Sequence, residues 1–227
     1  MTRFSTLIYL MLACLVLTNV PALSADEPPA AVMLVIGDSL SSAYGINIDE
    51  GWVALLQQQI STAGYNYHVI NTSVSGDTSR TGLGRTAAAL QTHQPSIVIV
   101  ALGGNDGLRG LALSETETSL AGIIERSQLE KAQVLLAGVR LPPNYGPVYN
   151  TQFAAVYRRL SDRYSIALVP QMLDQVAEHR ELLQNDGIHP TAAGQARIMH
   201  NIWTGLEPLL QQAAQNTTAP PNSKPRQ

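Results

Sequence analysis

The stretch at residues 30–41 reads "AAVMLVIGDSLS", in which an apolar run gives way at once to Gly37, Asp38 and Ser39. An unbroken run of this kind, rich in Val, Leu and Ile, is typical of a strand buried on both faces of a parallel sheet. Glycine, aspartate and serine are residues that favour turns. The stretch therefore predicts a buried strand that ends in a turn carrying a carboxyl group and a hydroxyl group.

Similar apolar runs recur along the chain and alternate with segments of helical periodicity. Strands that are joined by helical crossovers form right-handed parallel sheets. We therefore expect an α/β protein of flavodoxin-like type, a three-layer α/β/α fold with a five-stranded parallel sheet. The predicted strands are residues 30–36, 65–71, 96–102, 132–138 and 165–170, and the predicted helices are residues 50–64, 85–94, 114–130, 150–164 and 191–210.

Length and charge limit the kind of protein this chain can be. Its 227 residues are enough for one α/β domain with a well-buried core, and no break in composition demands a second domain. The formal net charge is −3 and no run of like charges occurs, which argues against nucleic acid as a partner. We expect a monomer that acts on a small molecule.

The beginning and the end of the chain differ from the rest. A short basic start is followed by a long apolar stretch, and "ALS" at residues 22–24 has small residues at the spacing that signal peptidase recognises. We expect a signal peptide at 1–24, export to the periplasm, and no membrane anchor after cleavage. An uncleaved anchor is the alternative, because the apolar stretch approaches the length of about 20 residues that spans a bilayer. The folded domain is expected at 25–210, with a disordered polar tail at 211–227.

Polar residues gather where the predicted strands end. In open parallel sheets, ligands bind beyond the carboxyl ends of the strands. The sequence places "GDS" (37–39), "NTSVSGDTSRTG" (71–82), "GGND" (103–106) and "NDGIHP" (185–190) at or near such ends. These four loops bring hydroxyl, amide, carboxyl and imidazole groups to one edge, so we expect the functional site there.

Asp186 and His189 form the most informative pair. They lie three residues apart across a turn, so the carboxylate can hold the imidazole Nδ1–H and leave Nε2 free as a base. Ser39 is the natural nucleophile for that base. The chain order of serine, acid and histidine matches the α/β-hydrolases, but no Gly-x-Ser-x-Gly elbow is present, so the arrangement must be a different one.

These segments resemble a known family. "GDSLS", the glycine in "SGDT", "GGND" and "DGIHP" are similar, in order and spacing, to the four sequence blocks of the SGNH hydrolases, also called GDSL esterases and lipases. "GGNDGLRG" and "RLPPNYG" further resemble the bacterial periplasmic group of acyl-CoA thioesterase I, lysophospholipase and arylesterase. The resemblance covers residues 31–210. It implies a serine esterase that hydrolyses acyl esters and thioesters through a Ser-His-Asp triad.

The resemblance also implies a role for each site residue. It makes Ser39 the nucleophile, His189 the general base and Asp186 the acid that orients the histidine. The oxyanion-hole donors would be the N–H groups of Ser39 and Gly76 and the side-chain amide of Asn105. Donors of this kind are what the tetrahedral intermediate of acyl transfer requires.

Apolar residues in two loops are expected to line the site for the acyl chain. In the related group the loops "LRGLAL" (108–113) and "RLPPNYG" (140–146) shape the acyl pocket. The predicted substrate-binding residues are Leu108, Leu111, Leu141 and Pro142. The carboxyl group of Asp38 is expected only to support its loop by hydrogen bonds to nearby backbone.

Simpler explanations exist for each residue taken alone. Ser39 can cap a turn, Asn105 can form an Asx turn and His189 can lie on the surface. Two other functions are open, namely an O-acetyl esterase of cell-envelope carbohydrates and a non-catalytic exported binding protein. We expect no metal and no cofactor, because no metal-binding or nucleotide-binding motif occurs and the only cysteine, Cys14, lies in the expected signal peptide.

Overall fold

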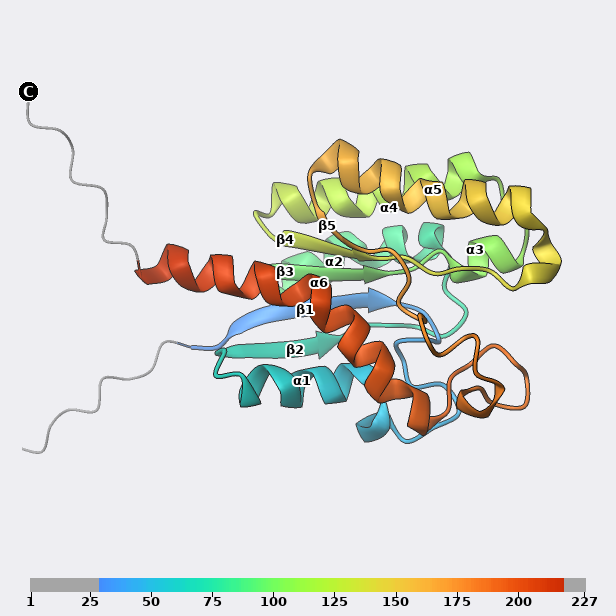
Figure 1. The fold of residues 1–227 in the computed structure, drawn as a ribbon. Coiled ribbons are helices and arrows are strands. Elements are labelled where there is room, and N and C mark those ends of the chain that lie inside the picture. The colour runs from blue at the N-terminus through green and yellow to red at the C-terminus, as the bar shows by residue number, and fades with distance from the viewer. Residues whose placement is uncertain (1–28, 219–227) are drawn as a thin grey trace, which may run out of the picture.

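A parallel five-stranded sheet lies at the centre of the structure, a computed structural model that describes residues 29–218 (Figure 1). The strands lie in the order β2-β1-β3-β4-β5, and every neighbouring pair is parallel. This confirms the predicted α/β class and the predicted number of strands. The bounds are β1 (Ala31–Gly37), β2 (Tyr67–Asn71), β3 (Ile97–Ala101), β4 (Gln133–Ala137) and β5 (Ala167–Val169).

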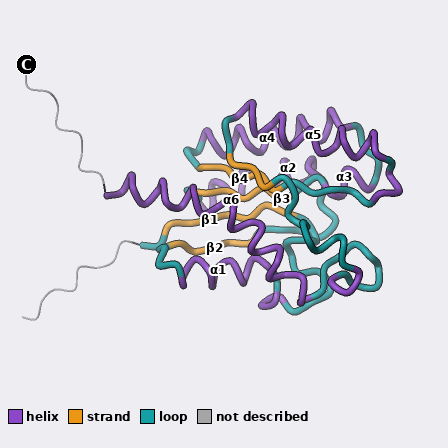
Figure 2. The backbone as a smooth tube through the Cα atoms, in the orientation of Figure 1, coloured by secondary structure: helices purple, strands orange, loops and turns teal. Residues whose placement is uncertain are grey.

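Helices cover both faces of the sheet and complete the three layers (Figures 1 and 2). On one face α1 (Trp52–Thr62) packs beside α6 (Ala192–Thr218). The other face carries α2 (Ser79–His93), α4 (Leu113–Leu129) and α5 (Pro147–Tyr164), and α4 contacts both of the others. A short helix α3 and three 3₁₀ segments lie in the connections, at Gly104–Leu108, Ile48–Glu50, Pro143–Tyr145 and Arg180–Leu182.

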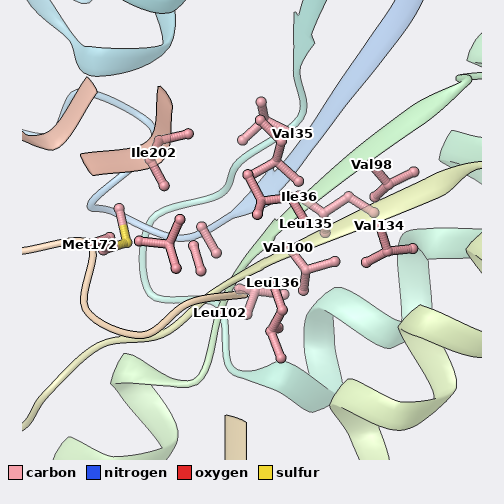
Figure 3. Packing of buried hydrophobic residues seen from close by; sticks show 14 of the residues in the cluster. Val35, Ile36, Val98, Val100, Leu102, Val134, Leu135, Leu136, Met172 and Ile202 are labelled. Carbon is pink, nitrogen blue, oxygen red and sulfur yellow. The ribbon is translucent and has the colours of Figure 1, made fainter. Parts of the chain in front are cut away.

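The central strands are buried on both sides, which explains their continuous apolar sequence. Figure 3 shows side chains of β1, β3 and β4 packed together with Ile202 of α6 and with Met172, which follows β5. Ile36, Val100 and Leu136 are inaccessible to solvent. Burying one such side chain contributes about 1.5–3 kcal/mol relative to leaving it exposed. The hydrophobic effect on both faces therefore fixes the strands whose ends carry the polar loops.

The starts of helices α2 and α4 differ from the sequence-based expectation. Helix α2 begins at Ser79 instead of residue 85, because Thr78 caps it: the Thr78 hydroxyl accepts the Thr81 N–H and the Thr81 hydroxyl accepts the Thr78 N–H. Helix α4 begins at Leu113, one residue before the expected start, and its N-cap Ala112 makes no side-chain hydrogen bond.

The predicted domain limits are tested only in part. Helix α6 continues to Thr218, so the expectation of a disordered tail from residue 211 is wrong for 211–218. The expected signal peptide at 1–24 and residues 219–227 lie outside the described residues. No helix in the described part of the chain has the length and hydropathy needed to cross a membrane.

The sheet topology determines where a site can form. Strand β1 is paired with β2 on one side and with β3 on the other, so the connections after β1 and β3 leave toward opposite faces of the sheet. A crevice forms at such a switch point, beyond the carboxyl ends of the two strands. The loop with Ser39 follows β1 and the loop with Asn105 follows β3.

Candidate active site

Ser39 lies in a tight turn immediately after β1. The Asp38 carboxylate accepts the Leu40 N–H at 3.0 Å, and the Asp38 carbonyl accepts the Ser41 N–H at 3.1 Å. The chain passes close to itself here, since a Cβ atom on Gly37 would lie 2.6 Å from the Ser41 hydroxyl oxygen. The sequence Gly-Asp-Ser thus supplies the space and the hydrogen bonds that hold Ser39 at the sheet edge.

Ser39, His189 and Asp186 form a continuous hydrogen-bonded chain. The Ser39 Oγ lies 2.9 Å from His189 Nε2, and His189 Nδ1 lies 2.7 Å from Asp186 Oδ2. The other carboxylate oxygen of Asp186 accepts the N–H groups of Ile188, at 2.9 Å, and of His189, at 3.1 Å. The ring of Tyr44 lies against the imidazole, with the two centroids 4.5 Å apart.

The two aspartates of the site have opposite electrostatic environments. The hydrogen bond with His189 and those from backbone N–H groups lower the pKa of Asp186 to about 2. Asp186 is thus a carboxylate at neutral pH. Burial raises the pKa of Asp38 to about 6, against the opposing effect of the Leu40 N–H.

The side-chain amide of Asn105 points toward the loop that carries Gly76. Asn105 Nδ2 donates to the Asp77 carbonyl at 3.0 Å and to the Asp38 carboxylate at 3.3 Å. Gly76 has a φ of +83°, and its carbonyl accepts a hydrogen bond from Arg109 at 3.0 Å. Asn105 lines a cavity that opens beside Ser39 and His189, whereas Gly76 is not among the residues that line it.

The loop with Gly76 is attached to the turn that carries Ser39 by side chains. The hydroxyls of Ser42 and Ser75 lie 2.7 Å apart. Arg85 of α2 forms an ion pair with Asp77 at 2.7 Å and donates to the carbonyl of Gly37 at 3.1 Å and to that of Thr72. Arg85 therefore connects the ends of β1 and β2, a role that the sequence pattern did not indicate.

A cavity of about 830 Å³ opens beside Ser39 and His189. Leu108, Leu141 and Pro142 line it, as the sequence suggested. Leu111 does not, which corrects the expectation for this residue: its carbonyl accepts a hydrogen bond from the Tyr149 hydroxyl at 3.3 Å, on the side toward α5. The other apolar lining residues are Leu40, Val139, Pro143, Pro147, Leu173, Ala177, Leu183 and Ile188.

Two polar residues near the site make contacts that depend on the fold. Asp106 is buried, and its carboxylate accepts the N–H of Ser79 at 2.8 Å at the start of α2. Gln184 donates to the Tyr44 carbonyl in the turn that carries Ser39, a contact that was not predicted from the sequence. Among residues 29–218, no group of three or more His, Cys, Asp or Glu side chains is arranged to hold a metal ion.

Comparison with known proteins gives one consistent result. Residues 35–197 match the GDSL-like Lipase/Acylhydrolase family. The chain is 44% identical to Esterase TesA of Pseudomonas aeruginosa over 201 residues, which cover 88% of this chain and 98% of that protein. It is 39% identical to Thioesterase 1/protease 1/lysophospholipase L1 of Escherichia coli K12 over 196 residues, or 86% of this chain and 90% of that protein.

Solved structures agree with the sequence relatives. A crystal structure of TesA superposes with a TM-score of 0.78 at 46% identity and covers 78% of this chain and 99% of its own. The psychrotrophic esterase EstA from Pseudoalteromonas superposes with a TM-score of 0.75 at 34% identity and covers 79% of this chain and 98% of its own. The chain therefore belongs to the GDSL-like lipase/acylhydrolase family.

Proposed function

We propose that this protein is a serine esterase that hydrolyses acyl esters and thioesters through Ser39, His189 and Asp186. The observation that carries the proposal is the 2.9 Å contact between Ser39 Oγ and His189 Nε2, beside an apolar cavity. A nucleophile, a base and a group that orients the base are the components of covalent acyl transfer. The names of the relatives, an esterase and a thioesterase/lysophospholipase, support the same reaction.

In the first half-reaction, Ser39 Oγ attacks the acyl carbonyl carbon while His189 Nε2 takes the hydroxyl proton. Asp186 remains ionised, accepts the Nδ1–H and stabilises the imidazolium that forms. The tetrahedral intermediate collapses when His189 gives the proton to the leaving alcohol or thiol. The acyl group is then esterified to Ser39.

In the second half-reaction, His189 takes a proton from water, and the water oxygen attacks the acyl-enzyme carbonyl carbon. The intermediate breaks the bond to Ser39 Oγ, which recovers its proton from His189, and a carboxylic acid leaves. The oxyanion in both halves would be stabilised by the N–H groups of Ser39 and Gly76 and by Asn105 Nδ2. Asn105 Nδ2 makes two hydrogen bonds, and the one to the Asp38 carboxylate, at 3.3 Å, is the longer. We expect Nδ2 to give up this hydrogen bond and to donate to the oxyanion instead.

The cavity lining supports acyl chains longer than acetyl as the substrate class. Eleven of its twenty lining residues are leucine, proline, valine, isoleucine or alanine, and its volume of about 830 Å³ is at the upper end of the range for small-molecule sites. Each buried methylene group contributes about 0.8 kcal/mol, so longer chains should bind and react better until the cavity is full. An esterase specific for acetylated sugars would not gain from such a lining.

The test is a panel of p-nitrophenyl esters from acetate to palmitate, with an acyl-CoA and a lysophospholipid, on the native protein and on Ser39→Ala. We expect kcat/KM to rise with chain length in the native protein and nearly all hydrolysis to disappear in Ser39→Ala. Acetate as the best substrate would favour the O-acetyl esterase instead. Full activity of Ser39→Ala would refute the triad.

We also infer that the enzyme acts in the periplasm. The support is in the sequence alone: a basic start, an apolar stretch and small residues at the cleavage spacing within residues 1–24. Expression in a Gram-negative host, followed by N-terminal sequencing of the periplasmic fraction, should give a chain that begins at Ala25. Recovery of the uncleaved chain with the membrane fraction would contradict this inference.

A further inference from the structure

Gln184 joins the turn that carries Ser39 to the loop that carries His189. Its Nε2 atom donates to the Tyr44 carbonyl at 2.8 Å and to the Pro190 carbonyl at 3.0 Å. Tyr44 belongs to the turn after β1, and Pro190 follows His189 directly. We propose that Gln184 is a positioning residue that holds the serine and the histidine at the distance needed for proton transfer. This inference rests on the proposed function.

The backbone of Gln184 is itself fixed within the histidine loop. Its N–H donates to the His189 carbonyl at 2.7 Å, and its carbonyl accepts the Gly187 N–H at 3.0 Å. The Arg180 guanidinium donates to the carbonyls of Gln184, at 2.5 Å, and of Asn185, at 3.0 Å. These hydrogen bonds hold the Gln184 backbone in place. They therefore fix the position from which its carboxamide reaches the turn after β1.

The nucleophile turn leaves space for this carboxamide. Gly45 has a φ of +75°, and a Cβ atom there would lie 2.3 Å from Gln184 Oε1. Any other residue at position 45 would be strained and would also collide with the glutamine side chain. The bond to the Tyr44 carbonyl holds the segment whose aromatic ring lies against the His189 imidazole.

The two N–H bonds of one amide nitrogen thus hold two different loops. Ser39 and His189 are far apart in sequence, so their contact depends on how these loops dock. A displacement of about 1 Å at a reacting atom can cost roughly 100-fold in rate. A side chain of the same length without donors at position 184 would release both carbonyls and loosen the docking.

The test compares Gln184→Met with Gln57→Met in the full-length native background. Gln57 is a matched control because its carboxamide also bonds backbone, the Tyr67 carbonyl at 3.1 Å and the Val69 N–H at 2.7 Å, between α1 and β2 and outside the cavity lining. For each variant, kcat and KM on p-nitrophenyl butyrate are measured per active site, titrated with a fluorophosphonate, together with Tm.

We expect kcat per titrated site to fall between about 10-fold and 100-fold in Gln184→Met, with KM nearly unchanged and the fluorophosphonate labelling rate reduced in parallel. Gln57→Met should have a lower Tm than the native protein but the same kcat. If Gln184→Met does not fold, Gln184→Asn replaces it, because the shorter carboxamide cannot reach both carbonyls, and the same result is expected.

A native value of kcat per titrated site in Gln184→Met would overturn the inference. An equal loss of kcat in Gln57→Met would also overturn it. Ser39→Ala separates this failure from failure of the proposed function. If Ser39→Ala is inactive and Gln184→Met is fully active, only the positioning role is wrong. If Ser39→Ala is active, the proposed triad itself is wrong.

Discussion

His189 Nε2 lies 2.9 Å from Ser39 Oγ although the two residues are 150 positions apart in the chain. The contact forms because β1 is a central strand and its carboxyl end lies at the same sheet edge as the connection between β5 and α6. The apolar strands bring the two loops to this edge, and polar groups within the loops set the final distance.

Asp186→Asn should lower kcat by about 10³-fold to 10⁴-fold. The variant keeps an oxygen for the Ile188 and His189 N–H groups, so the loop should keep its shape. It loses the negative charge that holds the Nδ1–H and stabilises the imidazolium. Steady-state hydrolysis of p-nitrophenyl butyrate measures the effect, and Asp162→Asn, at an exposed position of α5, is the control. A loss of less than about tenfold would remove Asp186 from the mechanism.

Asn105→Ala should lower kcat by about 10²-fold to 10³-fold with little change in KM, because an oxyanion-hole donor acts mainly on the transition state. Asn201→Ala is a matched control, because its Nδ2 also makes two hydrogen bonds, in this case to the backbone carbonyls of Met172 at 3.1 Å and Asp174 at 2.9 Å. The Tm of both variants should be lower than that of the native protein, and only Asn105→Ala should have a lower kcat. Equal kcat losses in the two variants would show that Asn105 is only structural.

Asp38 should make the folded state less stable as pH rises. Burial raises its pKa from 3.8 to about 6, so the folded protein holds this proton more tightly than the unfolded chain. The stabilisation is complete below pH 3.8 and is lost as pH rises through 6. Asp186, whose pKa falls from 3.8 to about 2, acts in the opposite direction but at lower pH.

Between pH 4 and pH 7, the free energy of unfolding of the native protein should therefore fall by about 2 kcal/mol relative to Asp38→Asn. Urea unfolding curves at several pH values measure this difference. The comparison uses the change with pH, so a constant loss of stability in the variant cancels. Parallel pH dependences in the two proteins would contradict the raised pKa.

Leu108→Asp should lower kcat/KM on an octanoyl ester far more than on an acetyl ester. Leu108 lines the cavity and is only half-buried, so the substitution should fold, unlike a change at the buried Leu141. The native protein should gain about threefold to fourfold in kcat/KM per added carbon, and the charged side chain should remove this gain.

Leu111→Asp is the matched control for this prediction, because Leu111 lies outside the cavity lining. Its chain-length profile should follow that of the native protein. Equal effects of the two substitutions on every ester, together with a fall in Tm, would mean that Leu108 only packs beneath its own loop.

Much of the fold could be predicted because the central strands β1, β3 and β4 are buried on both faces. Such strands need apolar side chains at every position, and this produces runs like Ile97–Ala101 that are visible in the sequence alone. Helix ends were less visible. Gly82 and Gly84 weaken the helical pattern at the start of α2. The capping box that Thr78 begins has Thr81 at its third helical position, where a glutamate or glutamine is usual.

The chemical groups of the candidate site were also visible, because turns with serine, glycine, asparagine and histidine follow the strands. The contacts that depend on tertiary packing were not. Gln184 is an ordinary residue in sequence, and its role exists only once the turn at Tyr44 lies beside it. Leu111 and Leu141 look equivalent as loop leucines, but only Leu141 faces the cavity.

The most direct test of the central claim is to locate the covalent adduct of a fluorophosphonate by mass spectrometry. The native protein should carry one adduct, on the peptide that contains Ser39, with the stoichiometry of the active fraction. Ser39→Ala should carry none, and His189→Gln should react far more slowly because the base is missing. An adduct on another serine of the native protein, or undiminished labelling of Ser39→Ala, would contradict the assignment of Ser39 as the nucleophile.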